Sequence, residues 1–154
     1  FTGAAKRLEL ISKNNTTVFY RDFAHAPSKV KATIEAAKAQ FPDKTLIAVL
    51  ELHTFSSLNE AFMQEYNGAL NNADEAAVFY SKHALELKRM PELKTEAVEA
   101  GFSKPGLAVI NERNVLEAWL QNRDFTNSVV LFMSSGNYDG FDVAAFAGSI
   151  TAKS

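Results

Sequence analysis

Two spacings of hydrophobic residues alternate along the chain. Residues 16–20 (TTVFY) form a short segment that is rich in β-branched and aromatic side chains, which is typical of a β-strand. From residue 30 to residue 41 the hydrophobic residues recur at steps of three or four, which predicts one face of a helix. Pro27 stands at the first turn of this helix, where its missing N–H is tolerated. Residues 16–41 are therefore predicted to form a strand followed by a helix.

The alternation continues toward the C-terminus. Residues 45–52 (TLIAVLEL) form an apolar run, which is typical of a strand buried on both faces of a parallel sheet. Further strands are predicted at residues 76–80, 107–110 and 127–133. Further helices are predicted at residues 58–70, 94–102 and 141–150. One more predicted helix ends at Gln121 and is capped by Asn111 or Asn114.

Strands that alternate with helices favour an α/β fold, here a Rossmann-like, doubly wound and mostly parallel sheet. Right-handed crossovers would place helices on both faces of that sheet. The opening differs, because residues 3–11 and the polar segment 13–16 (KNNT) predict a β-hairpin. We therefore expect one antiparallel pair at the N-terminal edge. With no repeat or linker, residues 1–154 are predicted to be a single domain.

The amino-acid composition of this chain disfavours several classes of partner and excludes several kinds of site. Sixteen Lys and Arg nearly balance eighteen Asp and Glu, so the net charge of −2 does not favour nucleic acid or an anionic membrane as a partner. The absence of cysteine excludes disulfides, thiolate metal sites and cysteine nucleophiles, and it fits a cytoplasmic protein. No apolar run approaches the roughly 20 residues that span a bilayer. Phe1 is not a natural start, which predicts a fragment of a longer chain.

Three loops that follow predicted strands carry candidate chemistry. Ligands of open α/β sheets bind at the carboxyl ends of the strands. In the first loop, residues 22–27 (DFAHAP), Asp22 and His25 precede a helix N-terminus and could face the hydroxyls and phosphate of one ligand. The alternative is that Asp22 caps a turn and His25 packs against its neighbours.

The other two loops are also open to two interpretations. In the second loop, residues 51–57 (ELHTFSS), Glu51 and His53 stand two positions apart, so in an extended segment their side chains would point to the same side. They could bind a polar substrate, or a metal that would need further ligands. The alternative is a strand end with a helix cap at Ser56 or Ser57. Residues 134–140 (SSGNYDG) could form a nest for a carboxylate or an ordinary turn.

The sequence lacks the motifs of several enzyme classes. The sequence contains no GxxxxGK[ST] phosphate loop, no GxSxG elbow and no HExxH zinc motif. His83 follows another predicted strand, but no neighbouring residue completes a catalytic set, so we interpret it as a surface or loop-packing residue. We do not expect this domain alone to turn over a substrate.

Three motifs together resemble the C-terminal domain of the Mur ligases, which is similar to that of folylpolyglutamate synthase. Residues 1–9 (FTGAAKRLE) resemble the family's F-x-G-x-x-R-R-hydrophobic-E stretch, and residues 21–27 (RDFAHAP) resemble its D-[YF]-[AG]-H-x-P motif. Residues 131–140 (LFMSSGNYDG) resemble the M-S-[SN]-G-x-[FY]-D-G loop of one branch, the murein peptide ligases. The motifs occur in the family's order along nearly the whole chain.

The resemblance implies a three-domain enzyme of which this chain is the third domain. An N-terminal UDP-sugar domain and a central ATPase domain would precede it, and ATP and Mg²⁺ would be held largely by the central domain. The full-length ligase would join UDP-N-acetylmuramate to the tripeptide L-alanyl-γ-D-glutamyl-meso-diaminopimelate in peptidoglycan recycling, releasing ADP and phosphate. The third domain would close over ATP and be inactive alone.

The resemblance also assigns roles to residues. Arg7 would lie near the ATP phosphates, Asp22 would bind the ribose hydroxyls, and His25 would lie beside the nucleotide. Lys6 and Ala26 depart from the family's usual Arg and His or Asn. Residues 51–55 (ELHTF) also depart from the family's pattern, and His53 is a candidate substrate contact. The pocket for the incoming peptide would be lined by Ser134, Ser135, Asn137 and Tyr138.

Two alternatives stay open. A UDP-N-acetylmuramate–L-alanine ligase would use the same chemistry with a smaller amine. A free-standing, non-catalytic binding domain of flavodoxin-like shape would instead carry an acidic cluster or cofactor loop after its first strand, where this chain has Asp22 and His25.

Overall fold

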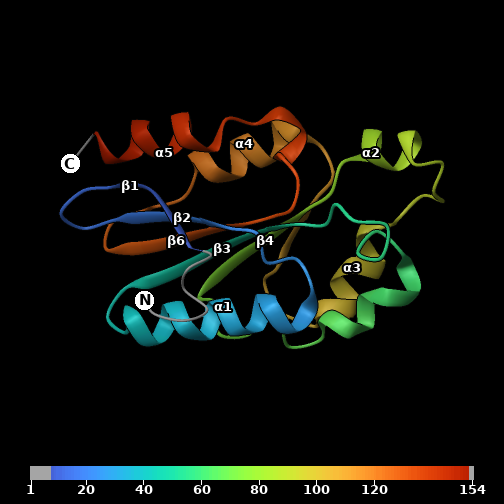
Figure 1. Ribbon diagram of the computed structural model, residues 1–154, viewed down its shortest axis with the longest axis horizontal. Coiled ribbons are helices and arrows are strands. Elements are labelled where there is room, and N and C mark those ends of the chain that lie inside the picture. Colours follow the sequence, from blue (N-terminus) through green and yellow to red (C-terminus); the bar gives the residue numbers. More distant parts are fainter. Residues whose placement is uncertain (1–7, 153–154) are drawn as a thin grey trace.

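The computed structural model describes residues 8–152, and within them six strands form one mixed sheet (Figure 1). Strand β1 (Glu9–Lys13) pairs antiparallel with β2 (Val18–Asp22), and the other neighbouring strands are parallel. The strand order is β1-β2-β6-β3-β4-β5. These observations confirm the predicted α/β fold with a hairpin at one edge.

The remaining strands match the apolar runs of the sequence to within two residues at each end. They are β3 (Thr45–Glu51), β4 (Glu75–Phe79), β5 (Ala108–Ile110) and β6 (Ser128–Met133). The helices are α1 (Pro27–Gln40), α2 (Lys82–Leu87), α3 (Thr95–Phe102), α4 (Arg113–Gln121) and α5 (Val143–Thr151), with 3₁₀ helices η2 (Glu60–Tyr66) and η3 (Tyr138–Gly140).

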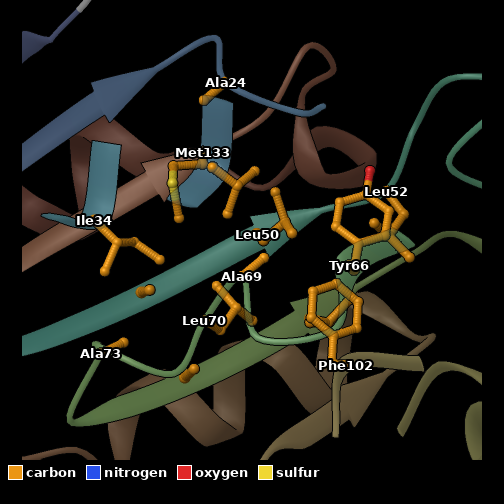
Figure 2. Packing of buried hydrophobic residues seen from close by; sticks show 14 of the residues in the cluster. Ala24, Ile34, Leu50, Leu52, Tyr66, Ala69, Leu70, Ala73, Phe102 and Met133 are labelled. Carbon is orange, nitrogen blue, oxygen red and sulfur yellow. The ribbon is translucent and has the colours of Figure 1, made fainter. Parts of the chain in front are cut away.

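Helices cover both faces of the sheet, as right-handed crossovers require (Figure 1). Along β3, alternate side chains enter different cores, so that Leu50 packs on the α1 side and Val49 on the α4 and α5 side. Figure 2 shows the first core, where Ile34 of α1 and Tyr66 and Phe102 of the neighbouring helices gather over the sheet. The second core contains Phe19, Phe79, Phe132, Leu116 and Val143, among others.

The structure differs from the predictions between β3 and α3. Residues 58–70 are not one α-helix, because only Glu60–Tyr66 is helical, of 3₁₀ type, and Gly68 (φ +81°) lies in the turns that follow. The start of this helix is capped by Asn59, since the Ser57 hydroxyl instead donates to the Thr54 carbonyl at 3.1 Å. The short helix α2 was not predicted.

The cap predicted for α4 was also wrong. Glu112 occupies the N-cap position and makes no side-chain cap hydrogen bond. Asn111 lies one residue earlier, and its amide nitrogen is 3.5 Å from the Tyr80 hydroxyl. Asn114 lies inside the helix. A side chain that finds another partner, or that stands one position away, cannot cap the first turn.

The strand order determines which loops are neighbours. Strand β6 comes last in the sequence but lies between β2 and β3, to both of which it is parallel. The carboxyl ends of these three strands therefore share one edge of the sheet. The loops that carry the candidate residues of the sequence start at this edge.

Candidate functional site

The loops after β2, β6 and β3 are hydrogen-bonded to each other. The Ser134 amide donates to the Asp22 carbonyl at 3.0 Å, which joins the end of β6 to the end of β2. The Tyr138 amide donates to the Glu51 Oε1 atom at 2.9 Å, which joins the same loop to the end of β3. Residues 134–138 therefore lie between the other two loops in a fixed position.

Glu51 holds the central loop in shape. Its side chain is 1% exposed. Its Oε1 accepts hydrogen bonds from the Ser134 hydroxyl at 2.5 Å and from the Tyr138 amide. Ser134 Oγ in turn accepts from the Gly136 amide at 2.7 Å. A buried carboxylate is costly unless donors surround it, so these bonds offset its desolvation and fix the loop.

His53 lies against the same loop. Its side chain is 37% exposed, and its Nδ1 is 3.9 Å from Glu51 Oε2. A Cβ atom added at Gly136 would be 2.7 Å from His53 Cγ and 2.9 Å from Glu51 Oε1. Only glycine fits at this position without displacing His53 or the loop.

Tyr138 is anchored in the core. It is 2% exposed, and its hydroxyl lies within donating distance of two carbonyls, Val49 at 2.8 Å and Met133 at 3.0 Å. Burial raises the pKa of the Tyr138 phenol well above its ordinary value, and the nearby Glu51 carboxylate adds to the shift. The hydroxyl expected to line a substrate pocket therefore points between β3 and β6. Ser135 and Asn137 are the candidate residues of this loop with exposed side chains.

Asp22 lies on the other side of the sheet. It is 1% exposed, and its Oδ2 accepts a hydrogen bond from the Thr33 hydroxyl of α1 at 2.7 Å. Its Oδ1 is buried and has no hydrogen-bond partner among residues 8–152. Because Thr33 lies on α1 whereas Tyr138 packs in the opposite core, the Asp22 and Tyr138 side chains point to opposite faces.

His25 is partly exposed at the start of α1. Its Nδ1 is 2.9 Å from the Phe23 carbonyl, and its own carbonyl accepts a hydrogen bond from the Tyr66 hydroxyl at 2.5 Å. Arg7 and Lys6 lie outside the described residues. The structure thus brings His53, Ser134, Ser135 and Asn137 onto adjoining loops, with Asp22 and His25 on the neighbouring loop at the same edge.

Some features of this site were not predicted. The sequence suggested Glu51 as a ligand for a metal or substrate, whereas the structure shows it bonded to Ser134 and to the Tyr138 amide. A single acidic residue at the end of an apolar strand was the available signal, but its partner lies 83 positions away along the chain. Within residues 8–152 no cluster of three metal-ligating side chains occurs. None of the helices in that range has the length and apolar composition needed to cross a bilayer.

Known proteins resemble this chain in sequence. The family model described as the Mur ligase, glutamate ligase domain matches residues 6–136. The UDP-N-acetylmuramate–L-alanine ligase of Lacticaseibacillus casei is 32% identical over 126 residues, which cover 80% of this chain and 26% of that protein. The enzyme of the same name from Streptococcus suis is 31% identical over 142 residues, covering 91% and 30%. The chain thus spans less than a third of these relatives.

Solved structures share the fold. A domain of a proposed UDP-N-acetylmuramate:L-alanyl-γ-D-glutamyl-meso-diaminopimelate ligase from Haemophilus ducreyi matches with a TM-score of 0.64 and 24% identity, covering 96% of this chain and 98% of that one. The murein peptide ligase of Psychrobacter arcticus matches with a TM-score of 0.68 and 18% identity, covering 99% and 30%.

The family model covers most of the chain, and the fold matches these solved structures along nearly its whole length. The chain belongs to the Mur ligase family and is its glutamate ligase domain, the C-terminal domain of these enzymes.

Proposed function

We propose that this chain is the third domain of an ATP-dependent ligase that joins UDP-N-acetylmuramate to an amine in peptidoglycan metabolism. The observation that carries the proposal is the family match over residues 6–136. The names of the sequence relatives, which are UDP-N-acetylmuramate ligases, support it. An N-terminal UDP-sugar domain and a central ATPase domain would belong to the same chain, and the reaction would be cytoplasmic.

The reaction would proceed in two steps. The UDP-N-acetylmuramate carboxylate attacks the γ-phosphorus of ATP, which releases ADP and forms an acyl phosphate. The amine then attacks the acyl carbon, phosphate leaves, and the amine nitrogen loses its proton as the amide forms. Charge that develops on oxygen in both steps needs fixed cationic or dipolar partners with water excluded. Closure of this domain would supply those partners when the substrates are bound.

We assign Arg7, Asp22 and His25 to ATP, with Mg²⁺ held by the central domain. A guanidinium can form two parallel hydrogen bonds to a phosphate, which suits Arg7 for the phosphates. Within the described part of the chain the buried Asp22 Oδ1 lacks a donor, so a ribose hydroxyl that reaches it would satisfy its bonding capacity. Since Asp22 is 1% exposed, this contact requires the groups that cover its side chain to move.

We propose the murein tripeptide L-alanyl-γ-D-glutamyl-meso-diaminopimelate as the amine substrate. The M-S-S-G-N-Y-D-G loop supports it by resembling that of the murein peptide ligases. The exposed side chains of His53, Ser135 and Asn137 would contact the peptide, and Ser134 and Tyr138 would keep the loop in place.

L-alanine is a second candidate for the amine substrate, and one observation favours it. The sequence relatives with 31–32% identity are L-alanine ligases. Phosphate release by the full-length protein with UDP-N-acetylmuramate, ATP and either amine separates the candidates. Turnover that requires the tripeptide supports the first candidate, and turnover with L-alanine alone supports the second.

If Arg7 and Asp22 contact ATP, Arg7→Ala and Asp22→Ala should each impair the full-length enzyme. Loss of a charged contact to bound ATP should raise the KM for ATP about tenfold or more and lower kcat. Steady-state phosphate release measures both constants, and Lys31→Met on the exposed face of α1 is the matched control. Wild-type constants in both variants would remove the assignment.

A further inference from the structure

Thr33 of α1 is the hydrogen-bond partner of the buried Asp22 carboxylate. Side chains alternate between the two faces of β2, and Val18, Tyr20 and Asp22 lie on the face that α1 covers. Thr33 precedes Ile34, which is buried in the core under the same helix. Thr33 Oγ1 donates to Asp22 Oδ2 at 2.7 Å. The bond therefore joins the end of β2 to the second turn of α1.

This bond fixes the orientation of the Asp22 carboxylate. A threonine hydroxyl carries one proton, which inside a helix often goes to a carbonyl of the preceding turn. In this chain the proton goes to Asp22 Oδ2, at a distance typical of an O–H donor on a charged acceptor. Rotation of the carboxylate would break the bond, so Thr33 determines which way the other oxygen points.

The second oxygen of Asp22 is left for another donor. Asp22 is 1% exposed, and within residues 8–152 its Oδ1 has no hydrogen-bond partner. A buried acceptor without a donor costs free energy, so a ligand whose hydroxyl reaches Oδ1 removes that cost when it binds. A ligand without the hydroxyl leaves the cost in place.

A second hydroxyl holds the backbone of the same loop. Tyr66 Oη donates to the His25 carbonyl at 2.5 Å, and the Tyr66 ring stacks on Phe102 with the ring centroids 4.8 Å apart. Tyr66 therefore fixes the backbone of the loop after β2, whereas Thr33 fixes the side chain of Asp22. Because the two bonds can be removed one at a time, a general loosening of the loop can be separated from the loss of one oriented oxygen.

We infer that Thr33 is a positioning residue that makes the nucleotide site prefer ATP to its deoxy analogues. Thr33 would hold Asp22 Oδ2, so that Oδ1 accepts a hydrogen bond from a ribose hydroxyl. The inference rests on the proposed function and deepens it, because it takes the assignment of Asp22 to the ribose and names the residue that orients this contact. A site built around a substrate hydroxyl discriminates strongly against an analogue that lacks it.

The experiment measures kcat and KM of the full-length protein for ATP, 2′-deoxyATP and 3′-deoxyATP by steady-state phosphate release. Thr33→Val keeps the shape of the side chain and removes the hydroxyl, whereas Thr33→Ser keeps the hydroxyl. We expect Thr33→Val to raise the KM for ATP about fivefold to tenfold. Its kcat, and its KM for the analogue that the wild type disfavours, should stay nearly unchanged. The preference for ATP should therefore be lost in Thr33→Val and retained in Thr33→Ser.

Two further variants show what a purely structural effect looks like. Tyr66→Phe should raise the KM for ATP and for both analogues by the same factor, because it loosens the loop without releasing Asp22 Oδ2. Thr126→Val makes the same exchange at an exposed position before β6 and should behave as wild type. If urea unfolding shows that Thr33→Val is not folded, Thr33→Ala makes the same comparison without a second methyl group beside the carboxylate.

Calorimetric titration of the same proteins with the three nucleotides separates this inference from the proposed function. Ligation by a Thr33→Val enzyme that keeps the wild-type preference for ATP overturns the role of Thr33 and leaves the proposed function intact. A preference that calorimetry shows to be lost in Thr33→Val, in a protein that ligates no amine, supports the role of Thr33 and overturns the proposed function. Equal affinity of the wild type for all three nucleotides, or an equal loss for all three in Thr33→Val, overturns the role of Thr33.

Discussion

Gly136 has no room for a side chain in the candidate site. Its neighbours are the His53 ring and the Glu51 carboxylate, both closer than a Cβ atom permits. Glu51 cannot give way easily, because it is buried and its Oε1 accepts two hydrogen bonds from the same loop. One glycine therefore allows the imidazole, the carboxylate and the loop to occupy their positions together.

Gly136→Ala should destabilise the protein by about 1–3 kcal/mol, because the added methyl group displaces His53 or the loop. It should also raise the KM for the amine substrate in the full-length enzyme. Urea unfolding and steady-state kinetics measure the two effects. Gly148→Ala in α5 is the matched control, since no atom lies within 4 Å of the added Cβ and alanine favours helix by about 0.5–1 kcal/mol. Equal stabilities of the two variants would contradict the steric argument.

At the scale of secondary structure, the Tyr138 side chain ties η3 to β3 and β6. The phenol hydroxyl bonds to backbone carbonyls near the ends of both strands, and the Tyr138 amide bonds to Glu51 at the end of β3. The loop between β6 and α5 is thereby fixed to the sheet from within. Its tip, with Ser135 and Asn137, is presented to solvent as a result.

Tyr138 should make stability fall at alkaline pH. Because the folded protein raises the pKa of the phenol above the unfolded value of about 10, its contribution is complete below that pH and is lost as the pH rises through the folded pKa. Between about pH 8 and pH 11, the free energy of unfolding of Tyr138→Phe should therefore fall less than that of the wild type. Urea titrations at a series of pH values test this, and parallel curves would contradict it.

The elements were largely predictable because their signals are local. The apolar run of β3 and the helical spacing before Phe41 each lie within a short window of sequence. The helix predicted at residues 58–70 was wrong, because the hydrophobic spacing there does not distinguish an α-helix from the 3₁₀ segment and turns that the structure contains. The bond from Ser134 to Glu51 and the buried orientation of Tyr138 depend on which strands become neighbours, and local spacing does not contain that information.

At the scale of the whole molecule, two cores share one sheet. Side chains of β2, β3, β4 and β6 contribute to the core under α1 and also to the core under α4 and α5. Neither core can lose its packing without exposing the strands that the other covers. We therefore expect the chain to unfold as one cooperative unit.

Ile34→Ala tests this cooperativity. Ile34 of α1 is fully buried in the first core, so its truncation should cost about 2–5 kcal/mol. Trp119, the single tryptophan, packs against the second core and reports on the opposite face by fluorescence. The fluorescence and far-UV circular dichroism transitions should shift together. Glu35→Ala, on the exposed side of α1, should change stability by less than about 0.5 kcal/mol. A tryptophan transition that stays at the wild-type midpoint would show two independent units.

The late position of β6 in the chain has a consequence for biosynthesis. While a ribosome is still producing residues before Ser128, β2 and β3 have emerged but lack the strand that lies between them. The nascent polypeptide then presents apolar, unpaired strand edges, which are the surfaces that chaperones recognise and that aggregation exploits. Closure of the sheet must wait for translation of its central strand, so this domain matures late, when almost all of it has left the ribosome.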